Sequence, residues 1–176
     1  MAARSAYNGY NLNKRTADPR DGRNYSTLSA ALIHPFSRGN VSLNSPHMWN
    51  LPKVNPAFYT APEDVELILQ MFQRSRAIWE IFVELGVADA EEFFPDKDVQ
   101  TDEQILEWIG ESMACVYHAA ATCKMGKASD EYAVVDGDAK VHGAERLRVV
   151  DASALPFLTP GHPQSVIVSL VVPKET

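Results

Sequence analysis

The sequence has few cysteines, no excess of positive charge and no long apolar run. Two cysteines in 176 residues are too few for a disulfide framework. A formal net charge of −7 argues against nucleic acid and anionic membrane surfaces as partners, because both require a basic face. No apolar stretch approaches the roughly 20 residues of a membrane span, and no secretory signal follows the first methionine. We therefore predict a cytoplasmic, reducing setting with neither nucleic acid nor membrane as partner.

Glycine motifs that cradle phosphate groups are also missing. No two of the nine glycines are separated by a single residue, so a G-x-G-x-x-G dinucleotide motif cannot occur. Gly126-Lys127 is followed by Ala128, which excludes the G-K-[ST] ending of a P-loop. The chain thus has no visible nucleotide-binding motif of its own.

Capping signals and hydrophobic spacing predict two helices. Residues 1–24 are polar and contain a turn signal, so we expect an irregular arm ahead of one domain over residues 25–176. Thr60 and Glu63 stand in capping-box spacing before a helical apolar pattern, which should end near Gly86. Thr101-x-x-Gln104 is a second capping box, with a further apolar face behind it.

Several short segments are rich in β-branched residues and predict strands. Residues 41–43 alternate like a strand, and 133–135, 147–150 and 166–168 are β-prone, with turn signals between them. Strands, then two helices, then strands again indicate an α+β domain. We expect an antiparallel sheet with helices on one face.

Two of the five histidines lie where a loop could present an acid/base group. His118 follows the second predicted helix and precedes a run of small residues. His162 stands between Gly161 and Pro163, in a rigid turn before an apolar run. Histidine is the usual general acid or base near neutral pH, and a rigid support positions such a group. Taken singly, each histidine is better explained by a structural role than by a functional one.

The cysteines allow two other kinds of site. Cys115, His118 and Cys123 could bind zinc with His142 as a fourth ligand, but the tight second pair of a zinc site is missing. Cys123 could instead be a nucleophile activated by His118, although no third orienting residue is recognisable. We favour burial of both cysteines as small hydrophobic residues and predict no metal.

An ordered set of motifs resembles the C-terminal region of glucose–methanol–choline (GMC) flavin oxidoreductases. The similarity covers roughly residues 21–172, and the aryl-alcohol-oxidase-like and versicolorin-B-synthase-like members look closest. Each motif is weak alone, but their order and spacing are specific. The segments are His34–Gly39, Tyr117-His118, Thr122–Gly126, Val134–Asp136, Val141–Gly143, Leu147–Ser153 and Pro160–Ser165.

The resemblance implies roles for particular residues. His118 matches the main acid/base group that acts on the substrate hydroxyl, and His162 matches its partner. Asp151 and Ala152 match the segment where the backbone meets the flavin pyrophosphate, and Pro163-Gln164 match the stretch that lies against the flavin ring. The resemblance therefore implies FAD as cofactor and an alcohol or hydrophobic metabolite as small-molecule substrate.

The chain also departs from the family pattern. Members begin with a G-x-G-x-x-G segment that binds FAD and close with a helix after the last motif, and we expect this chain to lack both. A separate FAD-binding chain or self-association could then complete it. We predict an FAD-dependent alcohol oxidase or dehydrogenase, represented by its substrate domain. The alternatives are a flavin-independent isomerase, cyclase or dehydratase of secondary metabolism that uses the same histidine pair, and a non-catalytic remnant.

Overall fold

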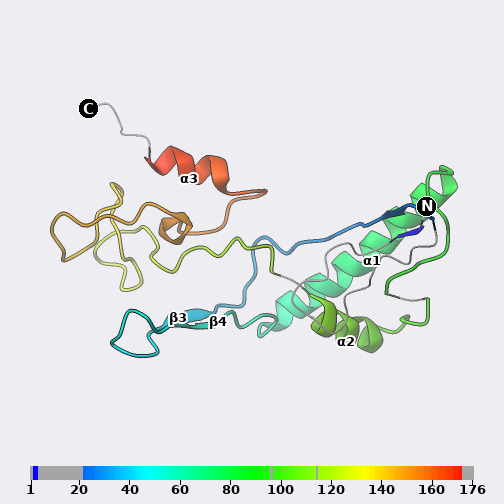
Figure 1. The fold of residues 1–176 in the computed structure, drawn as a ribbon, viewed down its shortest axis with the longest axis horizontal. Helices are drawn as coiled ribbons and strands as arrows, with labels where there is room; N and C mark the ends of the chain where they lie inside the picture. Colours follow the sequence, from blue (N-terminus) through cyan, green and yellow to red (C-terminus); the bar gives the residue numbers. More distant parts are fainter. Residues whose placement is uncertain (1, 4–21, 96, 114, 172–176) are drawn as a thin grey trace. The chain divides into compact units, whose positions relative to one another are not determined.

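The computed structural model describes residues 2–3, 22–95, 97–113 and 115–171 (Figure 1). Most of the predicted arm over residues 1–24 lies outside these residues. The chain divides into two compact units, which are described separately below. The first comprises residues 1–32 and 59–116, and the second comprises residues 33–58 and 117–176.

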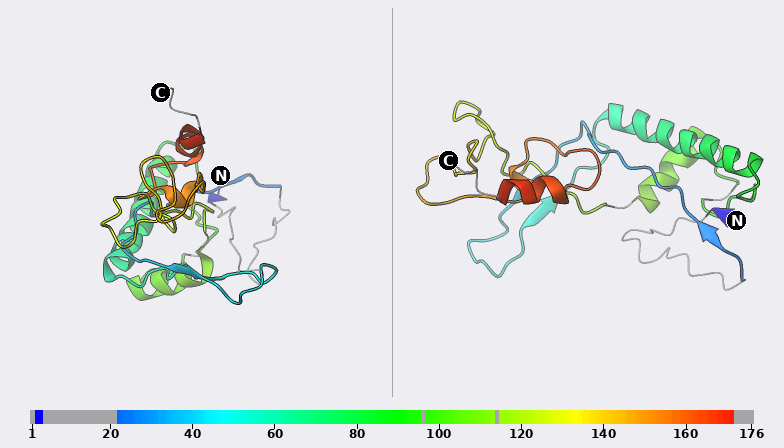
Figure 2. Two further views of the ribbon diagram at one scale, coloured as in Figure 1. Left: turned by 90° about the vertical axis from the view of Figure 1, so that its left-hand side faces the viewer. Right: turned by 90° about the horizontal axis from the view of Figure 1, so that it is seen from above.

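The first unit contains two helices. Helix α1 spans Pro62–Glu84 and helix α2 spans Asp102–Ser112, and the two lie side by side (Figures 1 and 2). The described part of this unit also contains a short parallel pair, β1 (Ala2–Ala3) with β2 (Tyr25–Ser26). Both helices fall where the hydrophobic spacing predicted them.

The two helix starts differ from each other. The Thr101 side chain accepts from the Gln104 backbone N–H, and the Gln104 side chain accepts from the Thr101 N–H, so the predicted capping box is confirmed. The capping box predicted at Thr60 is wrong. Helix α1 begins after Ala61 without a side-chain cap, and Pro62 stands in its first turn. Proline suits this place because its missing N–H would have no helical partner there.

Aromatic rings and two isoleucines hold the first unit together. The Trp108 ring of α2 lies 5.5 Å from the Phe72 ring of α1 and 5.1 Å from the Phe94 ring, measured between centroids. Ile105 and Ile109, on the face of α2 predicted to be apolar, are buried. Such tilted aromatic pairs contribute about 0.5–1.5 kcal/mol beyond the area that they bury.

The second unit contains the antiparallel pair. Strand β3 (Asn40–Ser42) pairs with β4 (Lys53–Asn55), with Val41 opposite Val54. A Cβ on Gly39 would lie 2.2 Å from the Asn55 carbonyl oxygen, so only glycine fits where β3 begins. With its helices and this short antiparallel sheet, the chain has the predicted α+β class.

The segments 133–135 and 147–150 do not form the predicted strands. They are loops joined by isolated bridges, with Val135 paired to Met125 and Val141, and Lys140 paired to Arg148. Val135 is completely buried at the centre of these loops. Val135 therefore serves as a core contact here, because strand propensity reports how well a side chain packs rather than an intrinsic backbone preference.

The apolar run near the end of the described chain is a helix. Helix α3 spans Gln164–Val171, so the strand predicted at residues 166–168 is wrong. A short apolar run rich in valine cannot be assigned to strand or helix by periodicity alone. None of the helices in the described part of the chain is long and apolar enough to span a membrane.

Candidate active site

Two imidazole rings meet in the second unit. His118 Nε2 lies 2.9 Å from His162 Nδ1, although the residues are 162 − 118 = 44 positions apart. The ring centroids are 5.1 Å apart and the planes are inclined by 87°. His118 is half-buried and His162 is exposed. The structure thus brings together the two histidines singled out in the sequence, while their catalytic roles stay predictions.

The loop that carries His118 is fixed on both sides. Tyr117 before it and Ala121 after it have φ angles of 61° and 69°, in the left-handed region that non-glycine residues rarely adopt. Three backbone N–H groups then donate to a short 3-10 helix, η1 (Ala152–Ala154): Ala121 to Ala152, Cys123 to Ser153 at 2.9 Å, and Met125 to Ala154 at 2.8 Å. These bonds hold the backbone that presents His118.

A glycine turn presents His162. Gly161 has a φ of 79°, and nothing lies within 4 Å of the place where a Cβ would stand. Directly after His162, the carbonyl of the buried Pro163 accepts the Ile167 N–H at 2.9 Å, which starts helix α3. His162 is therefore held between a left-handed glycine and the first turn of a helix.

Both imidazoles line one cavity of about 330 Å³. The remaining lining side chains are small or mostly apolar, apart from Gln164. A cavity with apolar walls and a few convergent polar groups is the usual form of a small-molecule site. The lining consists of Tyr117, His118, Ala119, Ala152, His162, Pro163, Gln164, Ile167 and Val168.

Three of the four residues predicted to contact FAD lie in this lining, namely Ala152, Pro163 and Gln164. Asp151 does not line the cavity. Its carboxylate caps η1 and accepts from the Ser153 N–H at 2.8 Å and the Ser153 hydroxyl at 2.5 Å. The hydroxyl and then the N–H of Ser153 lower the pKa of Asp151 below its ordinary value.

The lining fits one end of FAD and not the other. Ala119, Ala152 and the buried Pro163 offer small apolar surfaces beside the imidazoles, which suit a planar flavin ring. The diphosphate would find no glycine-rich cradle, because the sequence holds no G-x-G-x-x-G segment. Pro163 and Gln164, which were predicted to lie against the flavin ring, are therefore the residues of this lining that could contact it, whereas Ala152 was predicted to lie at the diphosphate.

The histidines proposed as zinc ligands have other partners. His142 Nε2 lies 3.1 Å from the Gly126 carbonyl oxygen, so it donates a hydrogen bond to the backbone. The ring of His118 pairs with His162. Within residues 22–95, 97–113 and 115–171, no three His, Cys, Asp or Glu side chains form a group that could hold a metal ion. His142 thus supports the fold of its loop.

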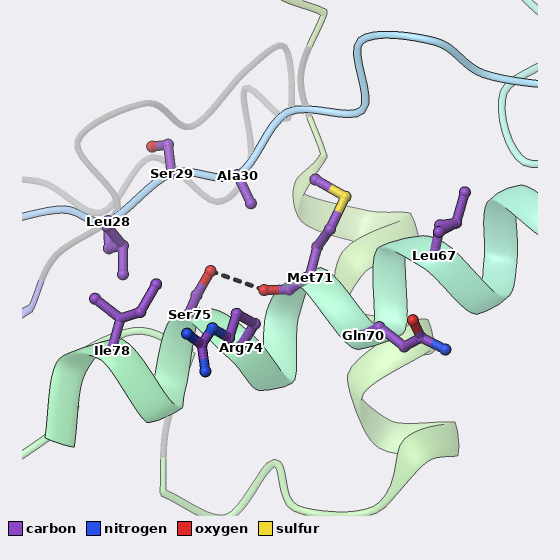
Figure 3. A pocket seen from close by; sticks show the side chains of 9 residues that line it. All are labelled: Leu28, Ser29, Ala30, Leu67, Gln70, Met71, Arg74, Ser75 and Ile78. Atoms are coloured by element: carbon purple, nitrogen blue, oxygen red, sulfur yellow. Dashed lines mark hydrogen bonds between the residues drawn. The ribbon is translucent and has the colours of Figure 1, made fainter. Parts of the chain in front are cut away.

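A second cavity, of about 400 Å³, lies in the first unit (Figure 3). Figure 3 shows residues 28–30 on one side of it and residues of α1 on the other. Leu28, Leu67, Met71 and Ile78 supply apolar surface, and the Ser75 hydroxyl donates to the Met71 carbonyl at 2.8 Å. Its lining contains no histidine, carboxylate or thiol, so this cavity lacks an acid/base pair.

Four lining residues were not predicted from the sequence: Tyr117, Ala119, Ile167 and Val168. Ile167 and Val168 were missed because their segment was predicted to be a strand. In a helix that begins at Gln164 they occupy positions i+3 and i+4, on the same face as Gln164. The proline directly before Gln164 was a usable signal for a helix start.

Comparison with known proteins gives a consistent result. A family model described as GMC oxidoreductase matches residues 35–170. Patulin synthase of Penicillium expansum is 46% identical over 164 residues, which are 93% of this chain and 26% of that protein. Versicolorin B synthase of Aspergillus parasiticus is 43% identical over 150 residues, which are 85% of this chain and 23% of that protein.

A solved structure of a fungal aryl-alcohol oxidase has a TM-score of 0.68 and 32% identity, over 79% of this chain and 23% of that one. The expected likeness to aryl-alcohol-oxidase-like and versicolorin-B-synthase-like proteins is confirmed. The chain spans about a quarter of the length of the curated relatives that it matches.

Proposed function

Because the chain belongs to the GMC oxidoreductase family, we propose that it supplies the substrate-binding and acid/base part of an FAD-dependent alcohol oxidase or dehydrogenase. The observation that carries this proposal is the His118–His162 pair, joined at 2.9 Å and lining a cavity with the flavin-contact candidates Ala152, Pro163 and Gln164. The remaining three quarters of the relatives' length, or a separate chain, would hold the nucleotide part of the cofactor.

The histidine pair suits oxidation of an alcohol. When an alcohol becomes a carbonyl compound, its hydroxyl proton must go to a base while negative charge develops on the oxygen. One imidazole nitrogen can accept that proton, and an N–H of the other ring can donate to the oxygen. The bound flavin would supply the hydride acceptor. Apolar lining residues such as Ile167 would keep water from the reacting carbon.

A second candidate function uses the same pair without redox chemistry. Both curated relatives reported above, 46% and 43% identical, are named synthases rather than oxidases. His118 and His162 could equally move protons in an isomerase, cyclase or dehydratase that acts on a hydrophobic metabolite. Such a reaction requires one group to remove a proton and another to supply one, and two adjacent imidazoles provide both.

An absorbance spectrum combined with a turnover assay tests the proposal. The purified protein is mixed with FAD, freed of unbound cofactor and examined for flavin absorbance, and alcohol oxidation is then followed with a dye as electron acceptor. A flavin spectrum with oxidation that is lost in His118→Ala is the expected result. Turnover of a substrate by colourless protein would favour the second candidate, and folded protein with neither property would indicate a non-catalytic remnant.

A further inference from the structure

We propose that the β3–β4 hairpin of one copy of this chain packs its tip into the α1 cavity of a second copy. The hairpin tip comprises residues 43–51. The α1 cavity is the cavity of about 400 Å³ between residues 28–30 and helix α1 (Figure 3). This inference concerns an interaction surface, so it does not depend on the proposed function of the histidine pair.

The first support is the exposure of large apolar side chains at the hairpin tip. Leu43, Met48, Trp49 and Leu51 are each at least 80% exposed. Exposed apolar side chains that gather in this way mark surfaces of protein association. Tryptophan is also one of the residue types that most often dominate the binding energy of an interface. The tip therefore has the composition of a surface that another protein covers.

The second support is the set of hydrogen bonds that hold the tip. The Ser45 hydroxyl oxygen accepts from the His47 N–H at 3.1 Å and from the Asn50 side-chain amide at 2.7 Å. The Asn50 N–H donates to the His47 carbonyl oxygen at 3.1 Å. Met48 and Trp49 lie between these bonded residues, so the backbone that presents them is fixed before binding. A fixed loop loses less conformational entropy on binding than a loose one.

The third support is the lining of the α1 cavity. Leucine, isoleucine and methionine side chains supply its apolar walls (Figure 3). Arg74 also lines the cavity, and within the described part of the chain its guanidinium has neither a hydrogen bond nor an ion pair. A guanidinium binds favourably over the face of an indole ring. The cavity thus offers apolar contacts and a cation–π partner to Trp49 of a second copy.

The fourth support is the distribution of charge along the chain. Residues 33–58, which include the hairpin, contain two basic and no acidic side chains. Residues 59–116, which include α1, contain 14 acidic and three basic side chains, a net charge of 3 − 14 = −11. Glu66 lies beside the cavity, because its carboxylate accepts from the Gln70 amide at 2.7 Å and Gln70 lines the cavity. Opposite charges therefore favour the contact, and every copy carries both surfaces.

Sedimentation equilibrium of the 176-residue chain tests the inference. We expect a mass above that of a single chain, with a dissociation constant of about 1–100 µM. Trp49→Ser removes the largest side chain of the tip, and Ala30→Trp fills the cavity from an exposed position in its lining. Each variant should raise the dissociation constant by at least about 10-fold. Ile78→Glu, which places a charge in the cavity wall, replaces Ala30→Trp if that variant fails to fold.

Mixing the two variants provides the most specific test. The proposed contact joins two different surfaces, so Trp49→Ser keeps an intact cavity and Ala30→Trp keeps an intact tip. With a fluorescent label on one of them, the mixture should associate although neither variant does so alone. Tyr132→Ser and Leu85→Ser are the controls, because both residues are exposed and lie outside the tip and the cavity. They should keep the wild-type dissociation constant, and circular dichroism checks that each variant is folded.

Several outcomes would overturn the inference. A wild-type chain that stays monomeric at about 100 µM excludes a second copy as the partner and leaves polypeptide outside this chain to cover the tip. Association that survives Trp49→Ser and Ala30→Trp, or a mixture of these variants that does not associate, excludes the contact between tip and cavity. Salt should weaken the association, because it screens the opposite charges. Binding that is identical at low and high salt would overturn the charge complementarity.

Discussion

His118 Nε2 and His162 Nδ1 lie 2.9 Å apart and share one hydrogen bond. One of these nitrogens must carry the proton and the other must accept it, because two protonated nitrogens cannot form this bond. The pair can therefore be neutral or hold a single extra proton without separating. His118 Nδ1 and His162 Nε2 take no part in this bond.

Replacement of His118 should reduce activity far more than replacement of His142. General acid/base groups contribute about 10²- to 10⁴-fold in rate, and His118→Ala should lose a factor of this size. His142→Ala removes only the hydrogen bond to the Gly126 carbonyl, which is worth about 0.5–1.5 kcal/mol of stability. Turnover is compared at matched folded fraction, as judged by circular dichroism. Equal losses in the two variants would contradict the assignment of His118.

At position 162, asparagine should preserve function better than alanine. The asparagine side chain can still accept from the His118 N–H and can donate to a substrate oxygen, although it cannot carry the proton of the pair. His162→Asn should therefore retain activity that is at least about 10-fold above that of His162→Ala, within the usual range for acid/base groups. The measurement is kcat for each variant across pH 6 to 9. Indistinguishable variants would show that position 162 does not contact the reacting oxygen.

Alanine at Gly161 should destabilise the second unit through the backbone alone. The φ of 79° suits glycine, and a left-handed conformation costs other residues about 1–2 kcal/mol. Gly137→Ala is the control, because its Cβ would also meet open space and its φ is not in that region. It should leave stability unchanged or raise it by up to about 1 kcal/mol. Urea unfolding of both variants checks this, and a smaller loss in Gly161→Ala than in Gly137→Ala would contradict it.

Acid should weaken the second unit through Asp130. Lys124 Nζ lies 2.7 Å from Asp130 Oδ2, and this contact, followed by the Tyr132 N–H, lowers the pKa of the carboxyl below its ordinary value of 3.8. Because the folded pKa is below the unfolded one, the charged group stabilises the fold above the unfolded pKa. That contribution is lost as the pH falls through the folded pKa.

The corresponding experiment measures the free energy of unfolding between pH 5 and pH 2. The wild type should lose stability as the pH falls below about 4, and Asp130→Asn should show a smaller decrease. Asp138→Asn is a suitable control, because Asp138 only approaches Lys140 at 3.6 Å across an exposed turn. A pH dependence that is identical in wild type and Asp130→Asn would rule out this origin of acid sensitivity.

Local signals predicted part of the fold from the sequence. The capping box at Thr101 was readable because its two partners are three residues apart and its hydrogen bonds do not depend on distant packing. Helix α3 could not be predicted as a helix, because valine and isoleucine occur both in strands and in apolar helices. Only the tertiary environment decides which of the two forms. The loops around Val135 were mistaken for strands for the same reason.

The site shows the same limit. The resemblance of ordered motifs made His162 the partner of His118, and the structure places both rings in one cavity. The motifs could pair the two residues because their order reflects a three-dimensional arrangement shared by a family. Nothing in the sequence marks Tyr117 as left-handed, since tyrosine is not a residue that signals this conformation. The contribution of Ile167 and Val168 became visible only once α3 was known to be a helix.

The backbone bonds between residues 121–125 and η1 also have an evolutionary consequence. These bonds join the two ends of the long loop formed by residues 126–151, so both ends of this loop are held next to the cavity. Residues 143–148, within this segment, are exposed. The entropic cost of closing a loop rises only slowly with the length of the loop. We therefore expect insertions within residues 143–148 to leave the backbone bonds to η1 in place. Related proteins with this fold can therefore differ in the length and surface of the loop at residues 143–148 without moving His118.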